Sequence, residues 1–297
     1  MEFSAWPSVT NPWEVLAEEA RHIDATGWKG IWIGDHFMPN QADTTGRWQE
    51  AWTVLAALAA LTSRVRLGTL VTGNTYRNPC ILAKQVAQVD VISGGRVTLG
   101  IGAGWQENEH VAYGVPFFTT GERLQRLEES LQILRSLFDN PLTAFEGRHY
   151  QVKDAPLQPK PLQPHLPILV GGGGEKVTLR LVAQYADAWN IPGPVEVVRQ
   201  KNAVLQQHCE RAGRDPRTVH RTGAILVNVA ERTTGGGLGH GPNWVMIDRP
   251  ADLVDALTPY AEAGMDEMIV HFNPALPLPQ RKELLSAFMA DVTPAFA

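Results

Sequence analysis

Short apolar runs alternate with longer amphipathic segments along the whole chain. Eight of the runs are rich in β-branched residues and bounded by turn-forming residues, a pattern typical of buried strands. The spacing between the runs leaves room for a helix after each strand. We expect strands at residues 2–6, 30–34, 65–71, from 97 onward, 168–170, 188–191, within 219–229 and at 267–272.

The segments between the runs carry helix signals. Asn11-Pro12 and Asn78-Pro79 each place a capping Asn before a proline, which favours a helix start. The segment 48–61 is apolar on nearly every face. Residues 139–167 are rich in proline and interrupt the alternation, with a small hairpin expected around 145–150. The expected helices are residues 12–26, 48–61, 79–93, 121–138, 175–185, 194–212, 250–263 and 280–289.

Eight strand–helix units without a break in composition indicate one α/β domain over residues 1–297. The expected fold is a (β/α)8 TIM barrel with a small insertion after the helix that follows the fourth strand. A doubly wound sheet is the alternative, although it usually has fewer strands. In a barrel, active sites are built from the loops that follow the strands.

Composition narrows the class of protein. The chain has 44% hydrophobic and 19% charged residues, which is typical of a globular protein with a large core. A net charge of −5 argues against nucleic acid or an anionic membrane as a partner. No apolar run reaches the length of a membrane span, and we see no signal peptide. We therefore expect a cytoplasmic protein in which Cys80 and Cys209 are free thiols rather than a disulfide.

The fourth apolar run leads into Gly100, Gly102 and Gly104, followed by Trp105 and an acid-rich segment expected to be a loop up to His110. Alternating glycines let a backbone approach a flat ligand closely, which favours a ligand loop over a plain turn. A dinucleotide fingerprint does not fit, because the third glycine comes one residue too early and the acids would repel a pyrophosphate.

Asp35-His36 follows the second strand and is the best acid–base candidate. Histidine titrates near neutral pH, and an adjacent carboxylate can orient the ring. The alternative is a surface histidine beside a helix-capping aspartate.

Four consecutive glycines, Gly171 to Gly174, precede Glu175 and Lys176 between a strand and a helix. Uncovered N–H groups at a helix start form an anion site, so we expect a phosphate to bind there. The alternative is a flexible turn. A Walker A motif is excluded, because the glycine spacing is wrong and Val177 follows the lysine.

Two other enzyme classes do not fit the sequence. Glu107, Glu109 and His110 could contribute metal ligands. No convincing group of ligands elsewhere in the chain completes such a site, so we expect no metal. No G-x-S-x-G motif occurs, which argues against serine hydrolysis.

Six segments resemble the luciferase-like monooxygenase superfamily, and the branch that they resemble most is the oxidoreductases that use the deazaflavin coenzyme F-420. The resemblance covers nearly the whole chain, although relatives that use FMN share much of the pattern. The segments are residues 32–37 (WIGDHF), 67–69 (LGT), 77–79 (RNP), 102–105 (GAGW), 109–114 (EHVAYG) and 186–190 (ADAWN).

The resemblance implies a barrel, usually dimeric, with the cofactor ring in the barrel mouth and its phosphate at the 171–176 loop. It also implies a non-prolyl cis peptide at Leu70-Val71 or a neighbouring bond, supporting the ring. We expect the dimer to form through the helices 48–61 and 79–93. The resemblance assigns cofactor contacts to Leu70, Val71, Asn74, Gly104, Trp105, Glu107, Asn108, Gly171, Gly172, Gly173, Gly174 and Lys176.

The expected activity is hydride transfer between coenzyme F-420 and a small apolar or aromatic substrate. His36 would donate or accept the proton, oriented by Asp35, and Trp6 and Trp244 would contact the substrate. The Gly-rich loop 231–247 contains only Arg232 as a full positive charge, which argues against a sugar phosphate. The alternatives are a monooxygenase that uses reduced FMN and a non-catalytic protein that binds flavin or deazaflavin.

Overall fold

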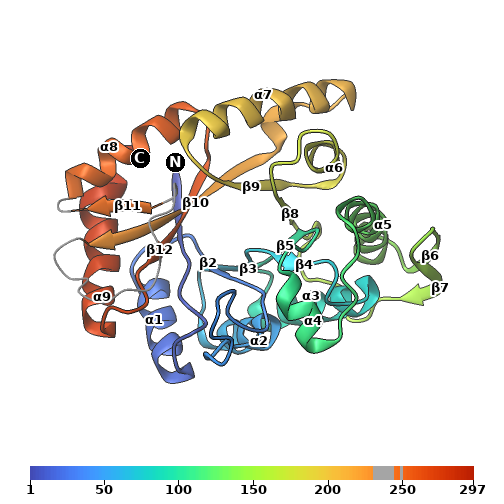
Figure 1. The fold of residues 1–297 in the computed structure, drawn as a ribbon, viewed down its shortest axis with the longest axis horizontal. Coiled ribbons are helices and arrows are strands. Elements are labelled where there is room, and N and C mark those ends of the chain that lie inside the picture. The colour runs from blue at the N-terminus through green and yellow to red at the C-terminus, as the bar shows by residue number, and fades with distance from the viewer. Residues whose placement is uncertain (230–243, 248–249) are drawn as a thin grey trace.

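The computed structural model describes residues 1–229, 244–247 and 250–297 (Figure 1). Eight parallel strands close into a ring, because β10 pairs with both β9 and β12. The predicted (β/α)8 barrel is thereby confirmed. Its strands are β1 (Glu2–Ala5), β2 (Gly30–Ile33), β3 (Arg66–Thr69), β5 (Val97–Gly102), β8 (Ile168–Gly171), β9 (Ala188–Pro192), β10 (His220–Val229) and β12 (Glu267–Phe272).

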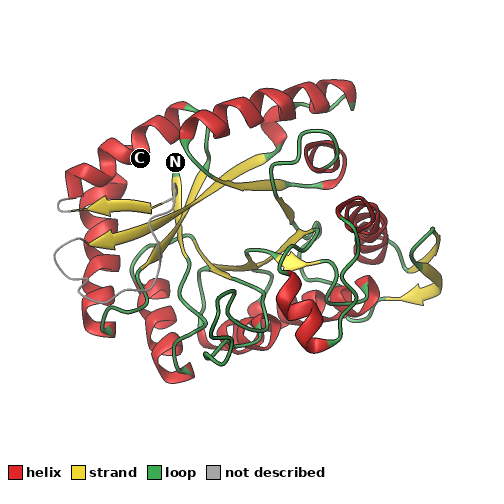
Figure 2. Cartoon of the chain, in the orientation of Figure 1, coloured by secondary structure: helices red, strands yellow, loops and turns green. Residues whose placement is uncertain are grey.

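Helices surround the ring of strands (Figure 2). The predicted insertion is confirmed as an antiparallel hairpin of β6 (Leu142–Glu146) and β7 (Gln151–Pro156), which lies beyond α5. Within the described residues, no helix is long and apolar enough to cross a membrane. The outer helices are α1 (Trp13–Ala25), α2 (Ala51–Leu61), α3 (Pro79–Ser93), α5 (Thr120–Asp139), α6 (Thr178–Tyr185), α7 (Val195–Arg211), α8 (Pro250–Glu262) and α9 (Leu278–Ala287). Short turns of helix follow as η1 (Pro216–Thr218), η3 (Phe288–Val292) and η4 (Thr293–Phe296).

Three segments differ from the expectation. The acid-rich segment after β5 is a helix, α4 (Glu107–Tyr113), and not a loop, because two acids in its first turn and Gly114 at its C-cap stabilise it. The expected third strand stops at Thr69 and resumes as β4 (Thr72–Gly73) beside β5. Part of the expected loop 231–247 is β11 (Trp244–Ile247), an apolar segment that pairs with β10.

The barrel interior is closed at the end where the strands begin. The carboxylate of Glu267, buried at the start of β12, accepts hydrogen bonds from Trp32 Nε1 at 3.1 Å and from the His220 ring at 3.2 Å. Above this layer lies a small apolar cluster that includes Leu169 and Ile269. A ligand must therefore enter from the other end, where the strands end and the predicted site residues lie.

Candidate active site

Asp35 follows β2 but does not contact His36 through its side chain. Its buried carboxylate forms a bidentate ion pair with Arg77, whose Nη1 and Nη2 lie 2.7 and 3.1 Å from the two oxygens. Arg77 also binds Glu50, the residue that caps α2. Both Arg77, just before α3, and Glu50, at the start of α2, lie beside the helices, so the Asp35 carboxylate is directed towards them. The prediction that Asp35 orients His36 is wrong.

His36 is oriented by Glu109 on α4. Its Nδ1 lies 2.7 Å from Glu109 Oε1, and its side chain is 18% exposed. The rings of Trp48 and Trp105 lie edge-on to the imidazole, with centroids 5.9 and 5.4 Å away. The sequence suggested Glu109 only as a metal ligand, because its partner is distant along the chain. Position after a barrel strand placed both residues at the same end of the barrel, but it did not reveal that they pair.

Glu109 is held as a charged acceptor. Its buried carboxylate accepts hydrogen bonds from the Phe37 N–H at 2.7 Å and from the Tyr76 hydroxyl, besides His36. Although burial acts to raise the pKa of Glu109, these hydrogen bonds hold it below its usual value. A carboxylate has no proton to give, so His36 Nδ1 is the donor. In the neutral ring, Nε2 is then an unprotonated acceptor, and no described residue hydrogen-bonds to it.

The glycines of β5 make room for Val71. The Leu70–Val71 peptide is cis, as the resemblance implied. A Cβ at Gly102 or Gly171 would lie 3.0 Å from Val71 Cγ2, and one at Gly100 would lie 1.8 Å from the Thr69 carbonyl oxygen. Residues larger than glycine at these positions would displace Val71 from the wall of the barrel.

Asn74 carries an unpaired polar group in the expected cofactor site. The side chain is buried, and its Nδ2 has no hydrogen-bond partner, although the backbone N–H donates to Gly102 at 2.9 Å. A buried amide without a partner costs free energy, which a ligand with a carbonyl acceptor would recover. The residues present therefore fit a flat ring that carries carbonyl groups.

The other residues expected near the ring are less enclosed. Gly104 adopts φ = 80°, which favours glycine, and Trp105 is 61% exposed beside His36. Glu107 is exposed in the first turn of α4, and Asn108 accepts the N–H of Glu109 through its side chain. Trp105 thus borders the imidazole, whereas Asn108 supports the helix that carries Glu109.

The glycine loop after β8 differs from the expectation in two ways. Helix α6 begins at Thr178 and not at Glu175, since Gly172 adopts φ = 126° and turns the chain first. The N–H of Gly172 donates to Asn190 at 3.0 Å, and its carbonyl accepts Trp189 Nε1 at 2.8 Å. The N–H of Gly172 is therefore already used, and the later glycines of the loop are the candidate phosphate contacts.

The cation that contacts this loop is Lys201 of α7. Its Nζ lies 2.8 Å from Glu175 Oε1, and its Cε lies 3.7 Å from the position of a Cβ at Gly173. Glu175 therefore offsets Lys201 and not Lys176, which is exposed. Sequence reasoning missed Lys201 because it lies on α7, one strand–helix unit after the loop. Consecutive units are side by side in a barrel, so a lysine on the next helix could have been considered.

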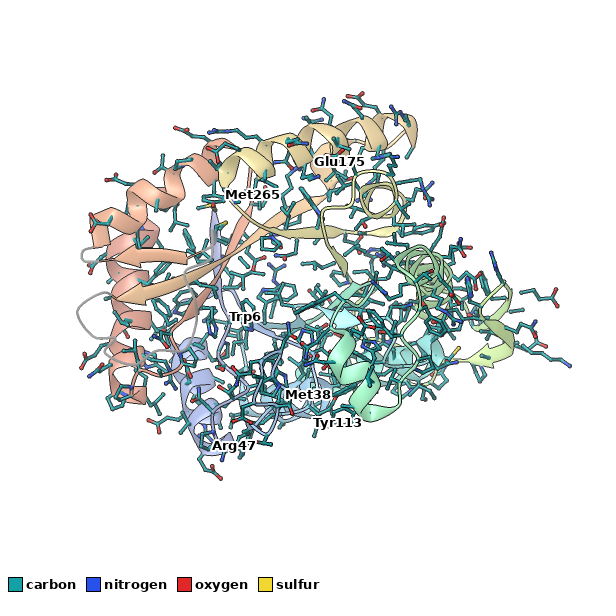
Figure 3. The ribbon with its side chains drawn as sticks, in the orientation of Figure 1. Trp6, Met38, Arg47, Tyr113, Glu175 and Met265 are labelled. Atoms are coloured by element: carbon teal, nitrogen blue, oxygen red, sulfur yellow. The ribbon has the colours of Figure 1, made fainter. Side chains whose placement is uncertain are left out.

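Trp6 lies inside the ring of strands (Figure 3). Its carbonyl oxygen accepts a hydrogen bond from Nδ1 of His271 at 2.7 Å. His271 is the lumen-facing residue near the end of β12, and the centroids of the two rings lie 5.1 Å apart. Burial lowers the pKa of His271 to about 4, so the ring is neutral near pH 7. Trp244 begins β11, but its side chain lies outside the described part of the chain.

Known proteins share this sequence pattern. The chain is 37% identical over 183 residues to an uncharacterized protein of Mycobacterium tuberculosis, a match that spans 61% of this chain and 63% of that protein. It is 28% identical over 317 residues to the F420-dependent glucose-6-phosphate dehydrogenase of Kineococcus radiotolerans, which covers 94% of this chain and 92% of the relative.

Solved structures share the fold. An F420-dependent secondary alcohol dehydrogenase in complex with an F420-acetone adduct superposes with a TM-score of 0.87 at 19% identity, covering 100% of this chain and 99% of that one. The F420-dependent tetrahydromethanopterin reductase of Methanopyrus kandleri gives 0.81 at 16% identity, covering 100% and 99%. The family model for luciferase-like monooxygenases matches residues 1–234. The chain belongs to the luciferase-like monooxygenase family.

Proposed function

We propose that the protein is a hydride-transfer oxidoreductase that uses coenzyme F-420, with His36 as the group that moves the proton. The observation that carries the proposal is the His36–Glu109 hydrogen bond of 2.7 Å, which leaves Nε2 free. Relatives named as F420-dependent dehydrogenases support the choice of cofactor, and one of them aligns with 94% of this chain.

The residues that would hold the cofactor lie around the barrel mouth. Val71 would support the ring, the buried Nδ2 of Asn74 would donate to a ring carbonyl, and Gly173 and Gly174 would contact the phosphate. When bound, a deazaflavin supplies a carbon that accepts or donates a hydride and reacts poorly with oxygen.

The protein supplies proton transfer and orientation. His36 Nε2 would accept the proton of a substrate hydroxyl when the substrate is oxidised, and would return it in the reverse reaction. Glu109 fixes the ring through Nδ1 and stabilises the imidazolium that forms, because its carboxylate is charged and buried. The rings of Trp48 and Trp105 limit the access of water to the imidazole.

The proposed substrate is a small, apolar or aromatic organic molecule. Trp6 offers an aromatic surface inside the ring of strands, and Trp105 offers another at its edge beside His36. We place Trp244 in the same role by its position in the sequence after β10.

The proposed assembly is a cytoplasmic homodimer formed through α2 and α3. Ile81 and Ile92 on α3 are 58% and 41% exposed, and a dimer formed through α3 would cover them. Light scattering at micromolar protein concentration tests the proposed dimer, and a monomeric mass would contradict it.

A cofactor titration tests the proposed function. Purified protein is mixed with F-420 or with FMN, and binding is followed by fluorescence. We expect F-420 to bind more tightly and to be reduced by at least one member of a panel of small alcohols. Tight binding of FMN alone, with oxygen consumption, would favour a monooxygenase, and binding without turnover would favour a non-catalytic protein.

A further inference from the structure

Glu109 Oε1 receives two hydrogen bonds, and only one of them comes from His36. The Tyr76 hydroxyl donates to the same oxygen, and its own oxygen lies 3.3 Å from His36 Nδ1. The second carboxylate oxygen is occupied by the Phe37 N–H. Tyr76 thus acts on the oxygen that would stabilise a charged imidazole, through its hydrogen bond to Glu109.

The local sequence holds the Tyr76 ring in place. A Cβ at Gly73 would lie 2.5 Å from the ring, so only glycine leaves room for it there. The ring also packs against Phe37 and His110, with centroids 4.7 and 5.1 Å away. His110 is in turn fixed by the Thr75 hydroxyl, 2.7 Å from its Nε2. This packing fixes the hydroxyl on Glu109.

The charges around the cluster keep the Tyr76 hydroxyl protonated. Burial, the hydrogen bond to Glu109 and the negative charges of Glu109 and Asp35 raise the pKa of Tyr76 well above its usual value, against the opposing charge of Arg77. The hydrogen bond from Tyr76 also helps to lower the pKa of Glu109. Within the part of the chain that the structure describes, the uncharged rings of Trp48 and Trp105 also contact the imidazole.

We propose that Tyr76 is a positioning residue. By sharing Oε1 of Glu109 with His36, it weakens the stabilisation that Glu109 gives to the protonated His36 ring. A second donor draws negative charge away from that oxygen, so less remains to stabilise an imidazolium. Tyr76 thereby eases release of the proton from His36. The consequence for turnover rests on the proposed function, whereas the proton equilibrium of His36 does not.

Proton titration of His36 by NMR tests the proposal in the full-length protein without substrate. In Tyr76→Phe, which keeps the ring, we expect the titration midpoint of His36 to move to higher pH than in the wild type. In Glu109→Gln the midpoint should move to lower pH, because the negative charge is lost. Tyr113→Phe is the matched control, since that exposed hydroxyl donates to the Phe37 carbonyl and not to Glu109.

An unchanged or lower midpoint in folded Tyr76→Phe overturns the proposal. Gly73→Ala is a second test, because a methyl group there displaces the ring, and its midpoint should also rise. Circular dichroism of each variant establishes that it is folded. A shifted midpoint in a protein that does not turn over F-420 would keep the role of Tyr76 and remove the proposed function.

Discussion

The two halves of the barrel mouth are built from different chemistry. From β2 to α4, each of two buried carboxylates has a side-chain partner: Asp35 has Arg77, and Glu109 has His36. From β8 to β12, the mouth includes the glycine loop after β8, and His271 near the end of β12 hydrogen-bonds to a backbone carbonyl. We propose on this basis a division of labour, in which one half handles a proton and the other accommodates a ligand by shape.

Asp35 and His36 are adjacent, but they belong to different parts of the charged half. Asp35→Ala would leave the guanidinium of Arg77 in a mostly buried position with only Glu50 to compensate it. We expect the free energy of unfolding to fall by about 3 to 5 kcal/mol, as measured by urea denaturation.

His36→Ala is the comparison for Asp35→Ala. Glu109 keeps its hydrogen bonds from the Phe37 N–H and the Tyr76 hydroxyl, so the free energy of unfolding should fall by less than in Asp35→Ala. If Asp35→Ala keeps its stability and loses turnover, Asp35 takes part in the chemistry after all.

His271, in the β8 to β12 half of the barrel mouth, should make the stability of the protein decrease at acidic pH. Its pKa of about 4 in the folded protein lies below 6.5, so the unfolded chain binds more protons between these values. The contribution of His271 to the free energy of unfolding is therefore fully present above pH 6.5. It falls by about 3 kcal/mol as the pH is lowered towards 4. Urea denaturation at pH 7 and pH 4 should show a smaller loss in His271→Gln than in the wild type.

His149→Gln is the control for His271→Gln, because His149 lies beside the hairpin and hydrogen-bonds only to Gln125 through its ring. Equal acid sensitivity in wild-type protein and His271→Gln would show that His271 can take up a proton without cost.

At the glycine loop after β8, added side-chain volume should weaken cofactor binding more than loss of a charge does. A Cβ at Gly173 would lie 3.1 Å from Ile191 Cδ1, so Gly173→Val must crowd the loop. We expect Gly173→Val to weaken binding of F-420 or FMN by about tenfold or more, whereas exposed Lys176→Ala should weaken it by less. Dissociation constants from fluorescence check this, with Gly121→Ala as a control in open space. Unchanged affinity in folded Gly173→Val would place the phosphate elsewhere.

Periodicity predicted most of the fold. All eight barrel strands and the hairpin were located, because buried strands and amphipathic helices leave regular apolar patterns. Among the short elements that were missed, α4 and β11 show the physical reason. Helix α4 is polar and only 7 residues long, and β11 follows a glycine-rich stretch, so neither has a recognisable period.

The candidate site was only partly predictable. Position after a strand suggested His36 and Asn74 as candidates, because barrel geometry sends such residues to one face. Which side chains pair was not readable, since His36 and Glu109 lie 73 positions apart and adjacent Asp35 faces the other way. Lys201 and Tyr76 were missed for the same reason, as their partners are distant in sequence.

The most direct test of the central claim compares F-420 reduction by wild-type protein and His36→Ala. The rate is measured by stopped flow with an alcohol that the wild type oxidises, beside the dissociation constant of F-420. We predict a rate lower by about 100-fold or more, with F-420 affinity changed by less than about twofold. A His36→Ala protein that reduces F-420 at the wild-type rate would contradict the account.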